Sequence, residues 1–410
     1  MLRPERRTRG DLLAAAAIVA VVAVVIAAFW WFSSARKTTF RPANGPAPNV
    51  PAAQEVPQGF TQLWSTASGK TAAPVVMGGT VVTGDGRTMT GIDTQTGAAR
   101  WSYARDAELC AVSYVYDLAI AVYPDRRGCG QVSGIKADTG QRGPTRTSYA
   151  DNQVVVSSDG TAVLSYGPTR LELWRSDLVR MLSYGEIDAR IKPVNTGLGQ
   201  GCALMSAAAS DSAAAVLEVC PGADELDLKL IKPAKDEDEP DTKKIDLTGL
   251  APDSDARVLA VAGTTTAVYL PTPEPRVAVY DETGSQISST PLAEAASLPA
   301  APPTLSRAGD RYTWWTGSAV LVFDSALGYR YTLEGTEERR PLGPATEMAG
   351  KLLVPVAGGI AVHDPTDGRF ERLIPLKHPP GSAPVLPAAI GSVIVEQRGA
   401  NVVGFGPSPR

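Results

Sequence analysis

Residues 91–101 read GIDTQTGAARW, and this stretch is the best copy of a pattern that recurs along the chain. In each copy an apolar strand runs into Asp, a tight turn with Gly follows, and another strand begins. Degenerate copies occur at 133–140, 277–284 and 360–368. Self-similarity with a period of about 40 residues is typical of propellers and solenoids, so we expect a chain built from similar β units.

Seven complete units of four short strands follow one another. They lie at about 74–103, 107–147, 150–185, 200–248, 256–292, 303–340 and 345–376. The remainder at about 383–406 lacks an outermost strand, whereas residues 60–65, FTQLWS, form a strand with no unit of their own. Pairing the two closes a ring and removes an open sheet edge. The sequence therefore predicts an all-β fold, an eight-bladed β-propeller, with seven blades as the alternative if the third or fourth unit is irregular.

Residues 12–32 form an uninterrupted apolar run that ends in FWWF. A helix of this length measures about 30 Å, which matches the hydrocarbon core of a bilayer. Four arginines within the first nine residues favour a cytoplasmic N-terminus. We therefore expect a cytoplasmic basic tail at 1–11 and a transmembrane anchor at 12–32. A cleaved signal peptide is the alternative, although the run is longer than a usual signal core.

The stretch 33–59 carries five prolines and almost no large apolar residues. Such a composition favours a semi-extended linker that holds a folded domain off the membrane. The propeller domain, 60–410, is then expected in the periplasm of a bacterial envelope. The acidic stretch at 232–240 lengthens one outer hairpin, and it is interpreted as a solvated loop, with a docking site as the alternative.

Four cysteines agree with an exported domain, because disulfides persist outside the cytoplasm. Cys110 and Cys129 have nearly the same spacing as Cys202 and Cys220, and each pair falls within one unit. Of the three possible connectivities, this matched spacing favours 110–129 and 202–220. No pair has the spacing of a zinc ligand motif, so we expect no metal site.

The pattern at 91–101 resembles the repeat of quinoprotein-type (PQQ-like) β-propellers, over most of 60–406. The resemblance implies that Trp101 and Trp64 pack neighbouring blades. Quinone-dependent dehydrogenases of this group resemble the chain in scaffold, and they carry a vicinal disulfide and acidic calcium ligands. No two cysteines are adjacent here, and no calcium ligand set can be assigned in the sequence. We therefore expect no cofactor.

The basic N-terminus, the anchor ending in Trp-Trp, and the stretches 81–86, 169–180 and 313–317 resemble a narrower group. This group is the polar growth factor A family of mycolic-acid-containing actinobacteria. Membership implies a periplasmic propeller that binds trehalose monomycolate. It also implies that the protein acts together with the inner-membrane exporter of mycolate lipids during envelope growth at the cell pole.

Catalytic motifs are lacking in the sequence, which has no nucleophile elbow, no phosphate-binding loop and no His-Glu-x-x-His. His363 beside Asp364 is interpreted as part of an ordinary blade rather than an acid–base pair. A formal net charge of −4 argues against a nucleic-acid partner, which would require a basic face. We expect a noncatalytic protein, although carboxylates from distant blades are able to meet in space.

Two aromatic groups are candidates for ligand binding. In the sixth unit Tyr312 and Trp314 share one face of a strand beside Arg311, and Trp315 takes the other face. One face should pack between blades, and the other is a candidate surface for a sugar ring or an acyl chain. The second group is Trp174 with Arg170 and Arg175, whose guanidinium groups suit sugar hydroxyls or phosphate. In both groups, packing within the blades is the alternative.

These observations together predict a membrane-anchored, noncatalytic propeller that binds a mycolate glycolipid, trehalose monomycolate, and assists its transport with an inner-membrane lipid exporter. A pure protein-interaction scaffold in the envelope is the first alternative. A quinone-dependent dehydrogenase is the second.

Overall fold

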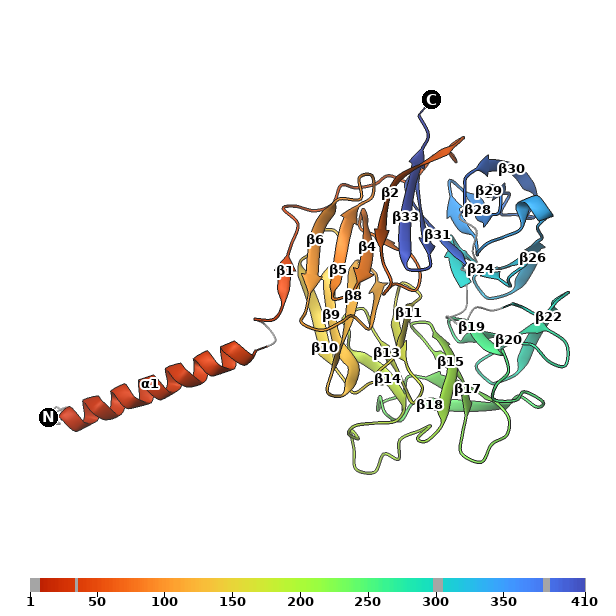
Figure 1. Cartoon of the computed structure of the whole chain (residues 1–410). Coiled ribbons are helices and arrows are strands. Elements are labelled where there is room, and N and C mark those ends of the chain that lie inside the picture. Colours follow the sequence, from red (N-terminus) through yellow and green to blue (C-terminus); the bar gives the residue numbers. More distant parts are fainter. Residues whose placement is uncertain (1–7, 34–35, 298–304, 379–383, 410) are drawn as a thin grey trace.

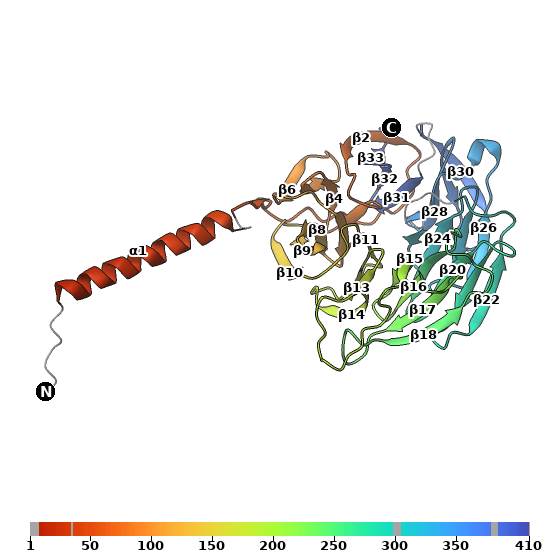
Figure 2. The same ribbon diagram turned by 60° about the horizontal axis from the view of Figure 1, so that its bottom comes forward.

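The structure, a computed structural model, describes residues 8–33, 36–297, 305–378 and 384–409. Eight antiparallel sheets stand around a central axis as the blades of a propeller (Figure 1). A second view of the same ribbon shows these sheets following one another around the ring (Figure 2). The eight-bladed prediction is confirmed, because the third and fourth units both form complete blades.

Within each blade the strands run in chain order from the central axis outward. Blades 1 to 4 consist of β3 (Val75–Met77), β4 (Thr80–Asp85), β5 (Thr88–Asp93) and β6 (Ala99–Ala104); β7 (Ala111–Val115), β8 (Leu118–Asp125), β9 (Gly128–Lys136) and β10 (Arg142–Thr147); β11 (Val155–Ser158), β12 (Val163–Tyr166), β13 (Arg170–Trp174) and β14 (Arg180–Gly185); and β15 (Ala203–Ala209), β16 (Ala214–Val219), β17 (Asp227–Lys232) and β18 (Asp241–Asp246).

Blades 5 to 8 repeat the same order, except that the outermost strand of blade 8 comes from the start of the domain. They consist of β19 (Arg257–Ala262), β20 (Thr265–Leu270), β21 (Arg276–Tyr280) and β22 (Gln286–Pro291); β23 (Leu305–Ala308), β24 (Arg311–Trp315), β25 (Val320–Phe323) and β26 (Tyr329–Leu333); β27 (Thr346–Met348), β28 (Lys351–Val356), β29 (Gly359–His363) and β30 (Phe370–Pro375); and β31 (Val385–Ile390), β32 (Val393–Arg398), β33 (Asn401–Pro407) and β2 (Phe60–Ala67). A short 3-10 helix, η1 (Glu337–Arg339), precedes blade 7.

The ring closes where β2 pairs with β33, from Phe60 opposite Pro407 to Ala67 opposite Asn401. In Figure 1 these two strands, from opposite ends of the colour scale, lie side by side. The predicted closure by residues 60–65 is therefore confirmed. Because the last sheet is completed by the first strand of the domain, the ring has no break between blades 8 and 1.

The meander gives the propeller two distinct faces. We call the side that carries the turns after each first and each third strand the turn face. The opposite side carries the turns after each second strand and the connections between blades, and we call it the connector face. The segment that follows the N-terminal helix reaches the propeller at the connector face, where Thr39 lies opposite Ala104.

The Asp of the repeat builds the turn after the third strand. In blade 1 the Asp93 carboxylate accepts hydrogen bonds from the backbone N–H groups of Gln95 at 3.0 Å and Thr96 at 2.9 Å. Gly97 then adopts a positive φ of 68°, which a residue with a Cβ adopts only with strain. Asp281 accepts backbone bonds in the same way in blade 5, so the sequence pattern encodes a turn.

The Trp of the repeat locks one blade onto the next. Trp64 lies over Gly97, where an added Cβ would come within 2.6 Å of the Trp64 side chain, and its indole N–H donates to the Thr94 carbonyl at 2.9 Å. Trp101 lies in the same way over Gly140, and its indole N–H donates to the Ala137 carbonyl at 2.7 Å. The packing role that the resemblance implied for both tryptophans is confirmed.

The N-terminal helix α1 (Arg9–Phe32) is long and apolar enough to cross a membrane, and none of its residues is buried. Thr8 caps its start, because the Thr8 hydroxyl accepts from the Asp11 backbone and the Asp11 carboxylate accepts from the Thr8 backbone. Figure 1 shows α1 extending away from the blades. Residues 1–7 of the predicted basic tail lie outside the described residues.

The stretch 33–59 was predicted to be a semi-extended linker that holds the domain off the membrane, and residues 39–58 of it lie on the propeller. β1 (Thr39–Arg41) pairs with β6 as a fifth strand of blade 1. We call residues 42–58 the belt, since they run from blade 2 over the turn face to blades 8 and 7. Along the belt, Ala43 and Ala47 donate to the turn of blade 2, and Val56 is buried against blades 7 and 8.

Two arginines on outer strands hold the belt by its carbonyl groups. Arg100 donates to the Pro46 carbonyl at 3.0 Å, and Arg372 donates to the Val56 carbonyl at 2.8 Å. An extended proline-rich segment leaves many carbonyl oxygens unpaired, and these guanidinium groups satisfy them. Only residues 33–38 remain between α1 and β1, and seven Cα–Cα steps span at most about 25 Å. If α1 spans a membrane, the start of β1 therefore lies within about 25 Å of the end of that span.

Both disulfides predicted from the cysteine spacing are present. The Cys110–Cys129 bridge joins the residue just before the first strand of blade 2 to the third strand of that blade. Cys202 and Cys220 join the segments that flank the first hairpin of blade 4. Each bridge therefore lies within a single blade.

Candidate functional site

A cavity with a volume of about 1250 Å³ forms a channel along the propeller axis. The innermost strands of all eight blades line it, and most of its lining residues are Val, Ala, Leu and Pro. Ligand pockets in proteins are typically apolar cavities of about 300–1,000 Å³ with a few convergent polar groups. The channel is therefore the candidate functional site.

One position in each innermost strand decides the polarity of the channel near the turn face. This position is the last residue but one of the strand, just before the first turn of the blade. Around the ring from blade 1 to blade 8 this position holds Val76, Tyr114, Ser157, Ala208, Val261, Arg307, Glu347 and Ala389. Four of the eight blades thus place a polar side chain there, whereas the others place a small apolar one.

Tyr114, Asp159, Arg307 and Tyr312 line the channel together, although they come from blades 2, 3 and 6. Burial raises the pKa of Tyr114, and the Asp159 charge raises it further while the Arg307 charge opposes the shift. The pKa of Tyr312 is also raised by burial, and the same two charges act on it. Blades 2 and 6 stand opposite each other in a ring of eight, and the same two charges act on a tyrosine from each of them. We call Tyr114, Asp159, Arg307 and Tyr312 the polar cluster.

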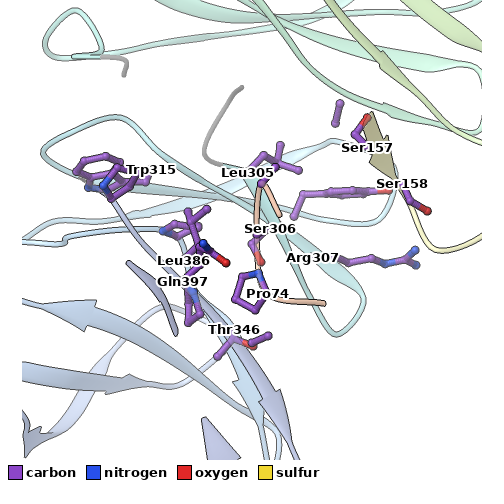
Figure 3. A pocket seen from close by; sticks show the side chains of 18 of the residues that line it. Pro74, Ser157, Ser158, Leu305, Ser306, Arg307, Trp315, Thr346, Leu386 and Gln397 are labelled. Atoms are coloured by element: carbon purple, nitrogen blue, oxygen red, sulfur yellow. The ribbon is translucent and has the colours of Figure 1, made fainter. Parts of the chain in front are cut away.

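Within this polar cluster Arg307 and Asp159 carry opposite charges. The Arg307 guanidinium lies 5.8 Å from the ring centre of Tyr312, and it makes no ion pair within the described residues. Asp159 accepts from the backbone N–H groups of Thr161 at 2.8 Å and Ala162 at 2.9 Å. In Figure 3 Arg307 and Ser158 lie on one side of the cavity, with Trp315, Leu386 and Gln397 on the other.

The connector end of the channel is more apolar. Residues from the connections between blades line it, including Ala72, Pro74, Leu342 and Pro384. Arg340 is the charged side chain among the lining residues at this end, and it is exposed. The channel is therefore polar toward the turn face and mainly apolar toward the connector face.

The structure divides the aromatic group of blade 6 between packing and the channel. Trp314 is fully buried against Tyr269 of blade 5, with ring centres 5.3 Å apart. Trp315 faces blade 7, where its indole N–H donates to the Pro341 carbonyl at 3.0 Å, and it also borders the channel. Tyr312 shares the Trp314 face, as the strand alternation predicts, and lines the channel.

Arg311 lies outside the channel lining and pairs with Asp310 at 2.6 Å. The second predicted group, Arg170, Trp174 and Arg175, also lies outside the channel lining. Arg175 is exposed on the surface and pairs with Asp177.

Trp174 and Arg170 are buried, and both donate to the carboxylate of Glu172. Arg146 and Arg180 also donate to Glu172, each at 3.0 Å. Burial by itself would raise the pKa of Glu172, but the three arginines outweigh it and lower the pKa to about 2. These groups form a buried charge network that joins blades 2 and 3.

The acidic stretch 232–240 is not the solvated loop that the sequence predicted. Glu237 pairs with Arg180 of blade 3, and its backbone carbonyl accepts from Ser183. Asp238 is buried, and its carboxylate accepts from the Asn195 amide at 2.7 Å. The physical reason is that the outer strand of blade 3 offers unpaired donors, which these carboxylates and carbonyls satisfy.

His363 is buried, and its Nδ1 donates to the Gly368 carbonyl at 2.9 Å. Burial lowers the pKa of His363, so the ring is mainly neutral at pH 7. Asp364 accepts from Thr366 in the neighbouring turn and pairs with Lys351 at 3.2 Å. Both residues therefore have structural partners within blade 7, as the sequence predicted.

Among the described residues, Cys202, Glu218 and Cys220 form the one cluster with the geometry of metal ligands. The two sulfur atoms are bonded to each other as a disulfide. Glu218 accepts from the Tyr184 hydroxyl at 2.8 Å, and burial raises its pKa. These partners account for the three side chains without an ion.

No family model matches the sequence, and neither does any curated protein. Solved structures match in shape. BamB from Moraxella catarrhalis is 13% identical over 85% of this chain and 99% of its own, with a TM-score of 0.47. The dihydro-heme d1 dehydrogenase NirN is 11% identical over 84% of this chain and 79% of its own, with a TM-score of 0.50. A streptogramin B lyase is 10% identical over 72% and 92%, with a TM-score of 0.41.

The likeness is one of fold. At 11% identity, the match to NirN shows the fold alone and not the activity. The narrower resemblance to the polar growth factor A family stays a prediction.

Sequence reasoning missed Tyr114, Asp159 and Arg307, since each stands in a different blade far from the others along the chain. A signal was nevertheless present. Aligning the units on their first turns shows polar residues at one position where other units carry Val or Ala. This alignment would have identified the blades that contribute polar groups to the channel.

Proposed function

We propose that this chain is a noncatalytic binding protein, anchored at the membrane by α1, whose central channel holds an amphiphilic lipid. The observation that carries the proposal is the channel itself, a cavity of about 1250 Å³ that is mainly apolar but contains a polar cluster. An acyl chain gains free energy from leaving water for such a lining, and a polar head gains hydrogen bonds. The anchor supports the proposal because it keeps the channel near a source of lipid.

The finer form of the proposal names a mycolate glycolipid, trehalose monomycolate, and an inner-membrane lipid exporter as the partner. It rests on the resemblance to the polar growth factor A family, together with the basic N-terminus and the two disulfides. The basic N-terminus and the disulfides favour a domain on the outer side of the cytoplasmic membrane. Location at the cell pole belongs to the same proposal.

Native mass spectrometry of the full chain in nanodiscs with trehalose monomycolate tests this function. We expect one lipid adduct per chain, and loss of that adduct in Ala208→Trp, which fills the channel from blade 4. Ala326→Trp, on an exposed turn of blade 6, is the matched control and should bind as the parent does. An unchanged melting temperature establishes that each variant is folded. Absence of an adduct at saturating lipid would contradict the proposal.

A pure scaffold is the second candidate, and one observation favours it. Ile287, Tyr329 and Phe370 expose apolar side chains near the starts of the outer strands of blades 5, 6 and 7. Large apolar side chains repeated along a rim suit a protein partner. Cross-linking in cells that captures a transporter subunit through this rim, without lipid in the channel, would support the scaffold instead.

A further inference from the structure

We propose that Tyr114, Asp159, Arg307 and Tyr312 form the head-group site for an amphiphile with an uncharged, polyhydroxylated head, whose tail lies toward the connector mouth and the membrane. This inference rests on the proposed function and adds to it the residues that hold the head and the direction of the bound molecule. It follows from the unused hydrogen-bonding groups of the cluster and from the side of the propeller where the anchor joins.

The cluster offers donors and acceptors together. Within the described residues the hydroxyls of Tyr114 and Tyr312 and the Arg307 guanidinium have no hydrogen-bond partner. Asp159 Oδ2 accepts only from the Thr161 hydroxyl, at 2.8 Å, and a carboxylate oxygen accommodates a second donor. A head with several hydroxyl groups satisfies both kinds of group, since each hydroxyl donates one hydrogen bond and accepts others.

The charged side chains at this end of the channel favour an uncharged polyol head over an anionic head. Arg307 alone would attract a phosphate or a carboxylate. However, Asp159 acts on the same two tyrosines, and Glu347 lines the channel from the blade next to Arg307. With two carboxylates and one guanidinium at this end, an anionic head meets net repulsion.

The direction of the molecule follows from the polarity of the channel. From the polar cluster toward the connector face the lining becomes apolar, through Ala207 and Ala260 to Leu305 and Leu386. A tail placed along these side chains is removed from water, whereas a tail in the opposite direction would leave through the charged end. The head therefore lies toward the turn face.

The anchor joins the propeller on the connector side. β1 runs antiparallel to β6 with Thr39 opposite Ala104, the last residue of β6 before the connection to blade 2. Just before β1, Lys37 pairs at 3.6 Å with Asp106 in that connection. Because residues 33–38 span at most about 25 Å, the connector side of blade 1 stays near the bilayer. A lipid whose tail points to the connector mouth thus has its tail toward the membrane.

Photo-cross-linking of the full chain in nanodiscs tests the assignment. Three alkyl lipids of equal chain length, each with a diazirine on the chain, carry a disaccharide, a phosphate or a phosphocholine head. Peptide mass spectrometry then locates the cross-links. We expect the disaccharide lipid to label the connector end, around Leu305 and Leu386, at least tenfold more than the other two lipids do.

Variants separate the head-group site from the channel. Arg307→Gln and Tyr312→Phe should each reduce disaccharide-lipid labelling at least fivefold, while Arg311→Gln, outside the channel, leaves it unchanged. If all three lipids label the channel equally and the variants have no effect, the head-group site is wrong although the proposed function stands. Preference for the phosphate lipid overturns the choice of a polyol. Labelling at the turn end overturns the direction, and no channel labelling by any lipid overturns the proposed function itself.

Discussion

The joints between blades 8, 1 and 2 and the joints between blades 2, 3 and 4 occupy equivalent places in the ring but use different chemistry. In the first sector a Trp of one blade lies over a Gly of the next, as Trp64 does over Gly97. In the second sector Arg146 and Arg180 converge on the buried carboxylate of Glu172. One ring geometry is therefore held in one sector by apolar packing on a close backbone approach and in the other by a compensated buried charge.

The charged sector should respond most strongly to the loss of one group. Glu172→Gln removes the negative charge and leaves three arginines without it. Breaking a buried pair in this way typically costs about 3–5 kcal/mol, and we expect this loss in the free energy of unfolding by urea. Asp177→Asn, which changes an exposed pair with Arg175, should cause no measurable loss. Equal effects from both variants would contradict the charged joint.

Acid should weaken the charged sector and spare the Trp–Gly sector. The pKa of Glu172 is lowered from 4.5 to about 2 in the folded chain, so its stabilising contribution is present above pH 4.5 and is lost as the pH falls toward 2. This lowering corresponds to about 3 kcal/mol. Unfolding measured from pH 6 to pH 2 should show the loss in the parent chain, and a smaller loss in Glu172→Gln. Parallel pH profiles for the two chains would exclude this contribution.

The Trp–Gly joint is tested by adding one carbon atom. Gly97→Ala places a Cβ within 2.6 Å of Trp64 at a φ of 68°, whereas Gly86→Ala meets nothing within 4 Å at a φ of 51°. Both substitutions bear the strain of a left-handed conformation, about 1 kcal/mol, and overpacking adds about 1–3 kcal/mol at Gly97 alone. The difference in unfolding free energy between the two variants therefore measures the joint. A difference near zero would mean that Trp64 moves aside freely.

The smallest expected effect concerns the indole hydrogen bond of Trp101, measured apart from the packing of its ring. Trp101→Phe removes the indole N–H that donates to the buried Ala137 carbonyl, which leaves that oxygen unpaired. In Trp314→Phe no such bond is lost, because the Trp314 indole N–H has no partner among the described residues. We expect Trp101→Phe to lower the melting temperature more, by an amount equivalent to about 1 kcal/mol. The reverse order would contradict the assigned role of the Trp101 indole.

The same comparison explains how much the sequence predicted. Where the repeat is regular, Asp93, Gly97 and Trp101 form contacts with residues nearby in the chain or in the next copy. The turns, the blades, the closing strand and the disulfides were therefore predictable. In the second sector the partners of Glu172 come from three strands, and no local pattern specifies them. The acidic stretch 232–240 was misjudged for that reason.

The belt and the polar cluster were beyond sequence reasoning for a related cause. The composition of residues 42–58 predicts an extended chain, but the arginines that hold it, Arg100 and Arg372, lie on blades far along the sequence. Similarly, Tyr114 and Arg307 belong to opposite blades, and only ring closure brings them to one channel. Local periodicity predicts the blades, whereas contacts across the ring depend on the closed fold.

A structure of the full chain with trehalose monomycolate bound tests the central claim most directly. We expect lipid density in the axial channel, with the sugar head beside Arg307 and Tyr312 and the acyl chains directed to the connector mouth near α1. Lipid density on the outer rim, or a channel that stays empty at saturating lipid, would contradict it.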